Sequence, residues 1–260
     1  MLNSMNPKII KYVLSDLLRN RSILIYTLAL LLLSLSVLLT ADNIDKGIAS
    51  LLQLVLFVVP LVCIIFSTIY LYNSSEFITL LVSQPLQRQG IWLSLFMGLA
   101  SAMSLAFLMG IGLPILIFAY SPSGLSLIVG GLLLSLIFVA IASCTAVSIR
   151  DKAKGIGLSI MLWLYFSLIF DAILLFILFQ FADYPIEKAL VVASMLNPID
   201  ITRILILLEI DLSAMMGYTG AIFRNFFGTG LGMAVTLSVM LLWVVVPIGF
   251  APRYFIKKDL

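Results

Sequence analysis

The stretch SSEFITLLVSQPLQRQG, residues Ser74 to Gly90, is a short polar interruption between two long apolar runs. It is too polar to span a membrane, and its pattern is that of a helix. Asn73 and Glu76 stand three residues apart, which is the spacing of a capping box with asparagine as the cap. Pro85 disfavours helical backbone in the residue before it. We therefore predict a short helix that starts at about Ser74 and ends at about Ser83.

One face of this predicted helix is apolar, because Phe77, Leu80 and Leu81 follow the i, i+3, i+4 spacing. Both ends of the helix join long apolar runs, so a partner that pushes on it would move two membrane helices together. The pattern therefore predicts a docking element. The alternative that the same pattern allows is a helix lying flat on lipid.

The composition places this element in a membrane protein. Of 260 residues, 63% are hydrophobic and 10% are charged, whereas soluble domains carry about 25% charged residues. The mean hydropathy is +1.22. A bilayer core needs about 20 helical residues, and six runs qualify: Ser22–Thr40, Ile48–Tyr72, Ile91–Tyr120, Leu125–Ile149, Ile156–Phe181 and Thr229–Ala251. The fold class predicted is an all-α integral membrane protein with six transmembrane helices, built as a single domain over residues 1–260.

The third run is longer than one straight crossing needs. It contains Gly110, Gly112 and Pro114, residue types at which helices kink or break. We expect the helix to be interrupted there.

The distribution of Lys and Arg predicts the orientation. With the N-terminus inside, four of the 15 basic residues lie outside: Lys46, Lys188, Arg203 and Arg224. The other eleven lie inside, at Lys8, Lys11, Arg19, Arg21, Arg88, Arg150, Lys152, Lys154, Arg253, Lys257 and Lys258. The positive-inside rule therefore puts both termini in the cytoplasm.

Residues 6–20 form a separate amphipathic element. Asn6 is a good N-cap and Pro7 suits the first helical position. One face carries Ile9, Ile10, Val13, Leu14, Leu17 and Leu18, with Lys8, Lys11 and Arg19 opposite. We expect an interfacial helix along the inner leaflet, where basic residues favour anionic lipid. Packing against other protein is the alternative.

The longest polar segment is residues 182–228, which the orientation places outside. Asn197 and Pro198 predict a second capped helix, with Asp200 in the first turn, where the helix dipole favours an acid. Its apolar middle predicts burial against the bundle or the interface.

Residues that carry chemistry are few. The chain has no histidine, and it has no phosphate-binding loop and no catalytic constellation. We therefore predict no catalytic residues, no bound cofactor and no nucleic-acid partner. Cys63 and Cys144 fall inside apolar runs, and Met97, Met103 and Met109 do not share a helix face, so no metal site is predicted. A copper contact at Met215 and Met216 is a separate hypothesis.

Asp171 is the one acid deep within an apolar run. An ionised acid at mid-bilayer costs about 2.5–3.5 kcal/mol on insertion scales. It either lines a pathway or binds a proton, or it is a protonated or hydrogen-bonded group near the outer interface. A stand-alone secondary carrier or channel that uses Asp171 is the alternative function, and an intramembrane enzyme is a third.

Three stretches carry a family resemblance. LLVSQPLQR (Leu80–Arg88) resembles the LLxxPxxR element of ABC-2-type permeases. RDKAKGIGLSIMLWLYFSLIFDAILL (Arg150–Leu175) and NPIDITRILILLEIDLSAMMGYTGAIFRNFFG (Asn197–Gly228) resemble the permease subunits that serve nitrous-oxide reductase maturation. The resemblance extends over nearly the whole chain.

This resemblance implies an ABC-2 permease fold of the type V, exporter-like kind in a bacterial inner membrane. It implies a homodimer with two copies of a cytoplasmic ABC ATPase, which holds ATP and Mg²⁺, and a periplasmic solenoid protein. The segment 74–88 would be the coupling helix, with ATPase-docking residues Glu76, Phe77, Thr79, Leu80, Ser83, Gln84, Pro85 and Arg88. The periplasmic partner would bind Asn197, Asp200, Arg203, Glu209 and Asp211.

The implied role is support of copper–sulfur centre assembly, by force transmission or by export of a sulfur species. The absence of histidine and of a shared Cys/Met face argues against a copper path through the spans.

Overall fold

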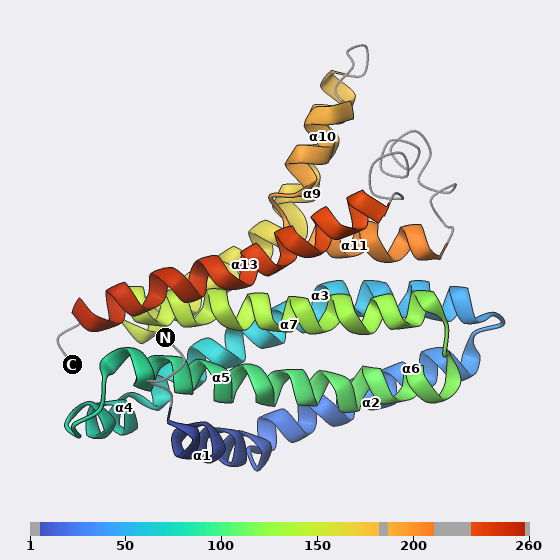
Figure 1. The fold of residues 1–260 in the computed structure, drawn as a ribbon. Coiled ribbons are helices and arrows are strands. Elements are labelled where there is room, and N and C mark those ends of the chain that lie inside the picture. The colour runs from blue at the N-terminus through green and yellow to red at the C-terminus, as the bar shows by residue number, and fades with distance from the viewer. Residues whose placement is uncertain (1–5, 182–186, 211–229, 258–260) are drawn as a thin grey trace.

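The computed structural model describes residues 6–181, 187–210 and 230–257, and this part of the chain is built from helices (Figure 1). The elements are α1 (Pro7–Leu18), α2 (Arg21–Thr40), α3 (Ile44–Asn73), α4 (Ser75–Val82), α5 (Arg88–Phe107), η2 (Leu108–Gly112), α6 (Leu113–Phe118), α7 (Pro122–Ser148), α8 (Lys152–Leu164), η3 (Tyr165–Ile169), α9 (Phe170–Gln180), α10 (Glu187–Ser194), α11 (Pro198–Glu209) and α13 (Gly230–Lys257).

The six predicted spans are confirmed within the described residues. The helices long and apolar enough to cross a membrane are Arg21–Thr40, Ile44–Asn73, Arg88–Phe118, Pro122–Ser148, Lys152–Gln180 and Gly232–Ala251. Side chains that face away from the bundle on α2 and α13 are apolar, among them Leu24, Ile25, Leu28, Leu241, Leu242 and Val245. Exposed apolar surface of this extent suits lipid rather than water.

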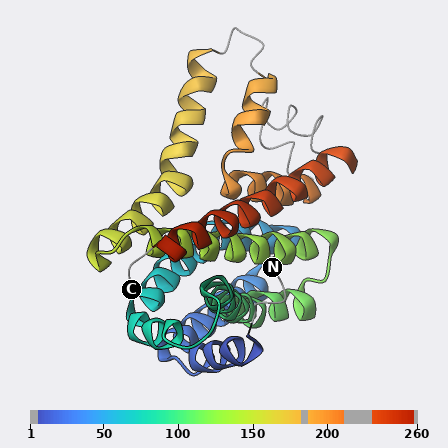
Figure 2. The same cartoon turned by 60° about the vertical axis from the view of Figure 1, so that its left-hand side comes forward.

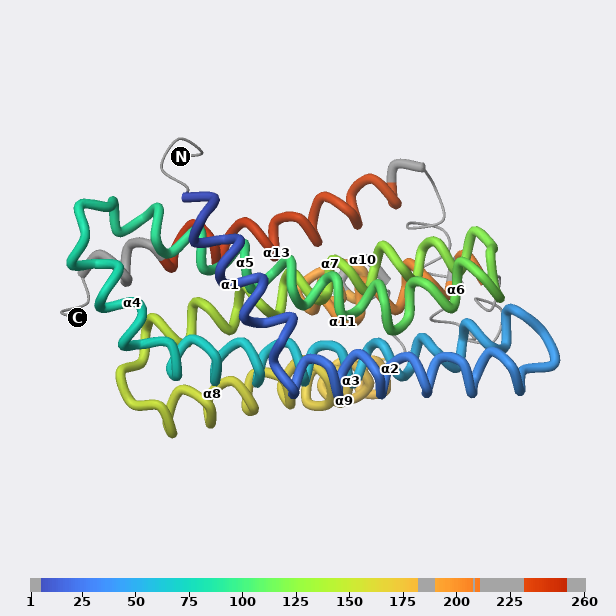
Figure 3. Tube along the Cα trace, turned by 90° about the horizontal axis from the view of Figure 1, so that it is seen from below, coloured from blue at the N-terminus to red at the C-terminus, as the bar shows by residue number. Residues whose placement is uncertain are grey.

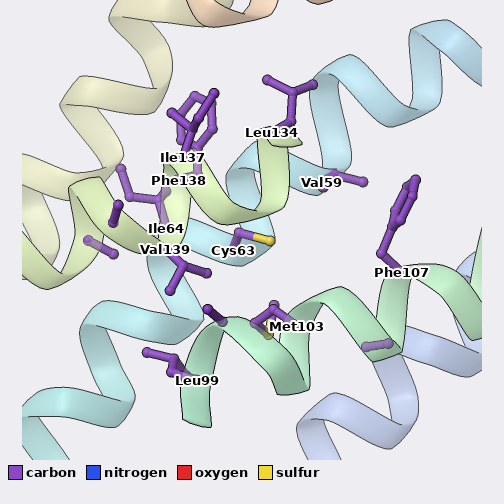
Figure 4. Packing of buried hydrophobic residues seen from close by; sticks show 14 of the residues in the cluster. Val59, Cys63, Ile64, Leu99, Met103, Phe107, Leu134, Ile137, Phe138 and Val139 are labelled. Carbon is purple, nitrogen blue, oxygen red and sulfur yellow. The ribbon is translucent and has the colours of Figure 1, made fainter. Parts of the chain in front are cut away.

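Helix α7 is the centre of the bundle, with α3, α5, α11 and α13 packed around it (Figure 1). Small residues allow the close approach of its neighbours. A Cβ on Gly131 would overlap Cζ of Phe107, and a Cβ on Gly130 would lie 2.8 Å from Cγ2 of Thr202. Figure 4 shows Phe107, Cys63 and Met103 in the surrounding core, where all three are fully buried.

The predicted interruption of the third span is confirmed as a π-helical segment, η2, at Leu108–Gly112. The backbone of η2 is hydrogen-bonded to α2: Ser34 Oγ donates a hydrogen bond to the Gly110 carbonyl at 2.7 Å. A Cβ on Gly110 would lie 2.6 Å from Leu30 Cβ. The glycine therefore permits the contact, and the serine satisfies a carbonyl in the interrupted turn.

A second π-helical segment, η3, interrupts the fifth span, and the sequence analysis did not anticipate it. Beyond η3 the chain leaves the bundle: α9 and then α10 project from it in both views (Figures 1 and 2). We call α9 and α10 together the arm. Among its described side chains, Phe170, Leu190 and Val191 are buried, and the latter two pack with Ile204 of α11.

Helix α1 is the element predicted for residues 6–20, and its capping is confirmed: Asn6 Oδ1 accepts from Lys8 N at 3.0 Å. It crosses the bundle over α5 and leads into α2 (Figure 3). Its stripe of Ile9, Val13 and Leu17 is buried against protein, with Val13 on Gly98 of α5. Packing against protein is therefore correct for this stripe, because Gly98 leaves room for it. Placement of the helix along a leaflet stays a prediction.

Candidate functional site

Helix α4 is the short helix that the opening stretch predicts, and it runs from Ser75 to Val82. The predicted capping box is wrong. Asn73 is the last residue of α3, and its Oδ1 accepts a hydrogen bond from Lys152 Nζ at 2.7 Å. Ser74 alone links α3 to α4, and no side chain caps α4 at that residue. A cap residue must leave helical geometry, which Asn73 does not do because α3 continues through it.

The buried face of α4 also differs from the prediction. Ile78 and Leu81 point inward, whereas Leu80 is 66% exposed. Phe77 is half-buried and stacks on Tyr12 of α1, with ring centroids 5.1 Å apart. The pair that faces the bundle is therefore Ile78 and Leu81, one residue further along the helix than the predicted pair Phe77 and Leu80.

Turning Leu80 outward creates one continuous exposed stripe, which we call the α4 stripe: Glu76, Thr79, Leu80 and Ser83. Thr79, Leu80 and Ser83 follow Glu76 by three, four and seven residues, so all four side chains lie on one side of the helix. Gln84 and Pro85 are exposed directly after it, and Arg88 is half-buried as the first residue of α5. The α4 stripe offers a partner an apolar side chain between hydroxyls and one carboxylate.

The end of α3, which leads into α4, is bonded to the connection between the fourth and fifth spans. Tyr72 Oη donates to the Ile149 carbonyl at 2.9 Å, next to the Asn73–Lys152 bond. A Cβ on Gly155 would overlap Tyr72 Oη. Residues 72 and 73, directly before α4, are therefore bonded to the connection that leads into α8.

A cluster of polar groups lies at the start of α11, at the base of the arm. We call it the α11 cluster: Asp171, Asn197, Asp200 and Arg203. Arg203 Nη1 lies 2.7 Å from Asp171 Oδ2 and 3.0 Å from Asp200 Oδ1. Asn197 Nδ2 lies 3.0 Å from Asp200 Oδ2 and donates to the Phe166 carbonyl of η3 at 2.8 Å. The cluster therefore joins α11 to the π-helical segment and to the first turn of α9.

The predicted cap of α11 is confirmed, since Asn197 Oδ1 accepts from Ile199 N at 3.0 Å. Asn197 and Asp200 are buried, however, so their side chains are turned into the protein. That differs from the partner-facing role expected of them. Arg203 and Glu209 are half-buried, and Asp211 lies outside the described residues.

Asp171 is hydrogen-bonded and ion-paired, which agrees with the second of the two interpretations given for it. The sequence analysis did not pair it with Arg203, 32 residues away. The signal was present, because one acid in an apolar span and one arginine in an apolar helix each need a buried counterion.

Burial, together with the hydrogen bond and negative charge of Asp171, raises the pKa of the Asp200 carboxyl to about 8, although Arg203 and Asn197 act in the opposite direction. Withdrawal from water disfavours the ionised form. Asp200 is therefore largely protonated at neutral pH.

No group of three or more Cys, Asp or Glu residues that suits a metal ion is present among the described residues. Met103 is buried, whereas Met97 and Met109 are exposed, as their different helix faces predict. Met215 and Met216 lie outside the part of the chain that the structure describes.

Comparison with known proteins indicates a class. The chain matches no protein-family model. It is 28% identical over 268 aligned positions to a protein of Stutzerimonas stutzeri named probable ABC transporter permease protein NosY, with 94% of this chain and 95% of the relative covered. A Pseudomonas aeruginosa protein of the same name is 29% identical over 225 positions, covering 78% and 82%. These findings support a NosY-like ABC transporter permease, and the described part of the chain has an all-α fold with six helices long and apolar enough to span a membrane.

Proposed function

We propose that this chain is the membrane subunit through which ATP hydrolysis by a separate cytoplasmic ATPase acts on the outer side of an inner membrane. The observation that carries the proposal is the α4 stripe, an exposed helix face fixed rigidly between two spans. The chain has no phosphate-binding loop of its own, so ATP and Mg²⁺ belong to the ATPase subunit. Two relatives named as ABC permeases support the same assignment.

The proposed assembly contains two copies of this chain, two copies of a NosF-like ATPase and a NosD-like periplasmic solenoid protein. Both termini and α4 are assigned to the cytoplasmic side, on the strength of the eleven-to-four bias of basic residues. The ATPase docks on the α4 stripe together with Gln84, Pro85 and Arg88. The periplasmic partner is assigned to the segment 182–228, with Arg203 and Glu209 as the partly exposed candidates.

The proposed role is support of copper–sulfur centre assembly in nitrous-oxide reductase, by transmitting force or by exporting a sulfur species. This role is what the resemblance of the sequence to permeases of nitrous-oxide reductase maturation implies, and the two relatives are named ABC transporter permease protein NosY. Copper transport through the spans is disfavoured, since the chain contains no histidine. Cys63 and Met103 are fully buried in the packed core (Figure 4).

The test is a charge reversal on the α4 stripe. In the complex reconstituted in lipid, Glu76→Lys is expected to lower stimulation of the ATPase about tenfold or more, because it places a new charge in the docking face. The double variant Pro85→Ala with Arg88→Glu is expected to uncouple hydrolysis in the same way. ATP hydrolysis and thermal unfolding are measured side by side, to separate uncoupling from misfolding.

Asp42→Lys is the matched control. Asp42 is exposed in the connection between α2 and α3, so its reversal adds the same charge away from α4. Coupling that survives Glu76→Lys as well as it survives Asp42→Lys contradicts the docking proposal.

A further inference from the structure

The arm is attached to the bundle at its base (Figures 1 and 2). There the small apolar contact of Leu190 and Val191 with Ile204 adjoins the α11 cluster. The contact between the arm and α11 therefore includes this apolar group and the ion pair of Arg203 with Asp171.

The charges do not balance when all groups are ionised. Asp171 and Asp200 share one guanidinium, that of Arg203, which leaves one excess negative charge. The side chain of Asp171 is 27% exposed, that of Asp200 is 6% exposed and that of Arg203 is 26% exposed. An excess charge in a site so far withdrawn from water is costly, and uptake of one proton removes it. Asp200 is the less exposed acid and has Asn197 beside it.

Among the side chains that the structure describes, the ion pairs of the α11 cluster are those that Arg203 makes with Asp171 and Asp200. Helix α7 contains no charged residue. The charged or titratable residues of the elements packed on α11 are Asp45, Lys46, Cys63, Tyr70 and Tyr72 of α3, Cys144 of α7, Tyr165 of η3, Glu187 and Lys188 of α10, and Arg253, Tyr254 and Lys257 of α13. Asp200 is therefore the group of this cluster whose proton we consider.

We propose that the α11 cluster is a proton-sensitive latch, in which a proton on Asp200 balances the charges and holds α11 against the base of the arm. Loss of that proton restores the excess negative charge and loosens the contact. The latch lies between an interrupted span and the helix that packs on α7, so its state sets how firmly the arm follows the bundle.

The direction of the pH dependence follows from linkage. Burial raises the pKa of Asp200 to about 8, whereas an opened, solvated aspartate has an ordinary value near 3.9. The closed state therefore binds more protons between these values. Stability of the latch is greatest at low pH and is lost as pH rises to about 8, above which it no longer changes.

The experiment is hydrogen exchange of α9 and α11 in the full-length chain in lipid nanodiscs, from pH 6 to 9, corrected for the intrinsic exchange rate. The opening constant of α11 is expected to rise about tenfold per pH unit up to about pH 8 and then to level off. Asp200→Asn, which mimics the protonated acid, is expected to abolish this slope. Glu209→Gln, on the same helix outside the cluster, is expected to keep it.

Asp171→Asn provides the second measurement. It removes one of the two negative charges and leaves Arg203 to Asp200 alone, so the levelling-off point is expected to move to lower pH. A wild-type profile as flat as that of Asp200→Asn overturns the latch. If Asp200→Asn loosens α11 at every pH, that variant does not test the latch, and the Asp171→Asn variant decides. The proposal is overturned if the opening constant of Asp171→Asn levels off at the same pH as that of the wild type.

Discussion

At the scale of single residues, glycine decides which helices approach one another. Gly131 lies under the ring of Phe107, and Gly98 lies under Val13. In both cases a side chain from another helix occupies the place where a Cβ would be. Gly157 of α8 has nothing within 4 Å of that place. The same residue type therefore carries a packing role at some positions and none at others.

Gly131→Ala is expected to lower the free energy of unfolding by about 1–3 kcal/mol, the usual cost of overpacking a close-packed core. Phe107 is fully buried and has little room to move. Denaturant titration of the protein in mixed micelles measures the change. Gly157→Ala is the matched control and is expected to be neutral or stabilising, since alanine is the better helix former. Equal effects of the two substitutions argue against the packing role of Gly131.

At the scale of elements, the two π-helical segments share one device. In each segment a backbone carbonyl accepts a hydrogen bond from a polar side chain elsewhere in the chain. Ser34 of α2 donates to the Gly110 carbonyl in η2, and Asn197, the N-cap of α11, donates to the Phe166 carbonyl in η3. Where a membrane helix departs from α geometry, its backbone groups must find partners inside the protein. These two bonds fix where α2 and α11 are placed on the bundle.

Asn197→Ala is expected to cost about 2–4 kcal/mol, because it removes a helix cap, about 1 kcal/mol, and leaves a buried carbonyl unsatisfied, about 1–3 kcal/mol. Asn20→Ala is the control, since Asn20 only caps α2 through Ser22 N at 2.9 Å. Denaturant titrations of the two variants make the comparison. An Asn197→Ala variant no less stable than Asn20→Ala shows that the Phe166 bond contributes nothing.

At the scale of the whole molecule, the chain has two ends with different elements. One end carries α4 and the connection from α7 to α8, and the other carries α11 and the connections 41–43 and 119–121 (Figures 1 and 3). The bias of basic residues assigns the α4 end to the cytoplasm. An ATPase docked at α4 would then act from the cytoplasmic side, whereas the α11 cluster lies within the bundle, where it includes Asp171 of the fifth span.

Cysteine labelling tests this assignment. Ser83→Cys and Asp42→Cys, both at exposed positions, are treated in inside-out and right-side-out vesicles with a maleimide that does not cross membranes. Ser83→Cys is expected to react from the cytoplasmic side alone and Asp42→Cys from the other. The parent chain, whose Cys63 is buried, gives the background. The reverse pattern of labelling contradicts the orientation.

The sequence by itself determined the six spans, the caps at Asn6 and Asn197 and the interruption near Gly110, because hydropathy, capping and helix breaking act within a few residues. It placed a short helix after Tyr72 but misassigned its cap and its buried face. Tertiary structure alone decided these, along with η3, the projecting arm and the pairing of Asp171 with Arg203. The physical reason is that burial of one helix face, and the balance of a buried charge, depend on neighbours distant in the chain.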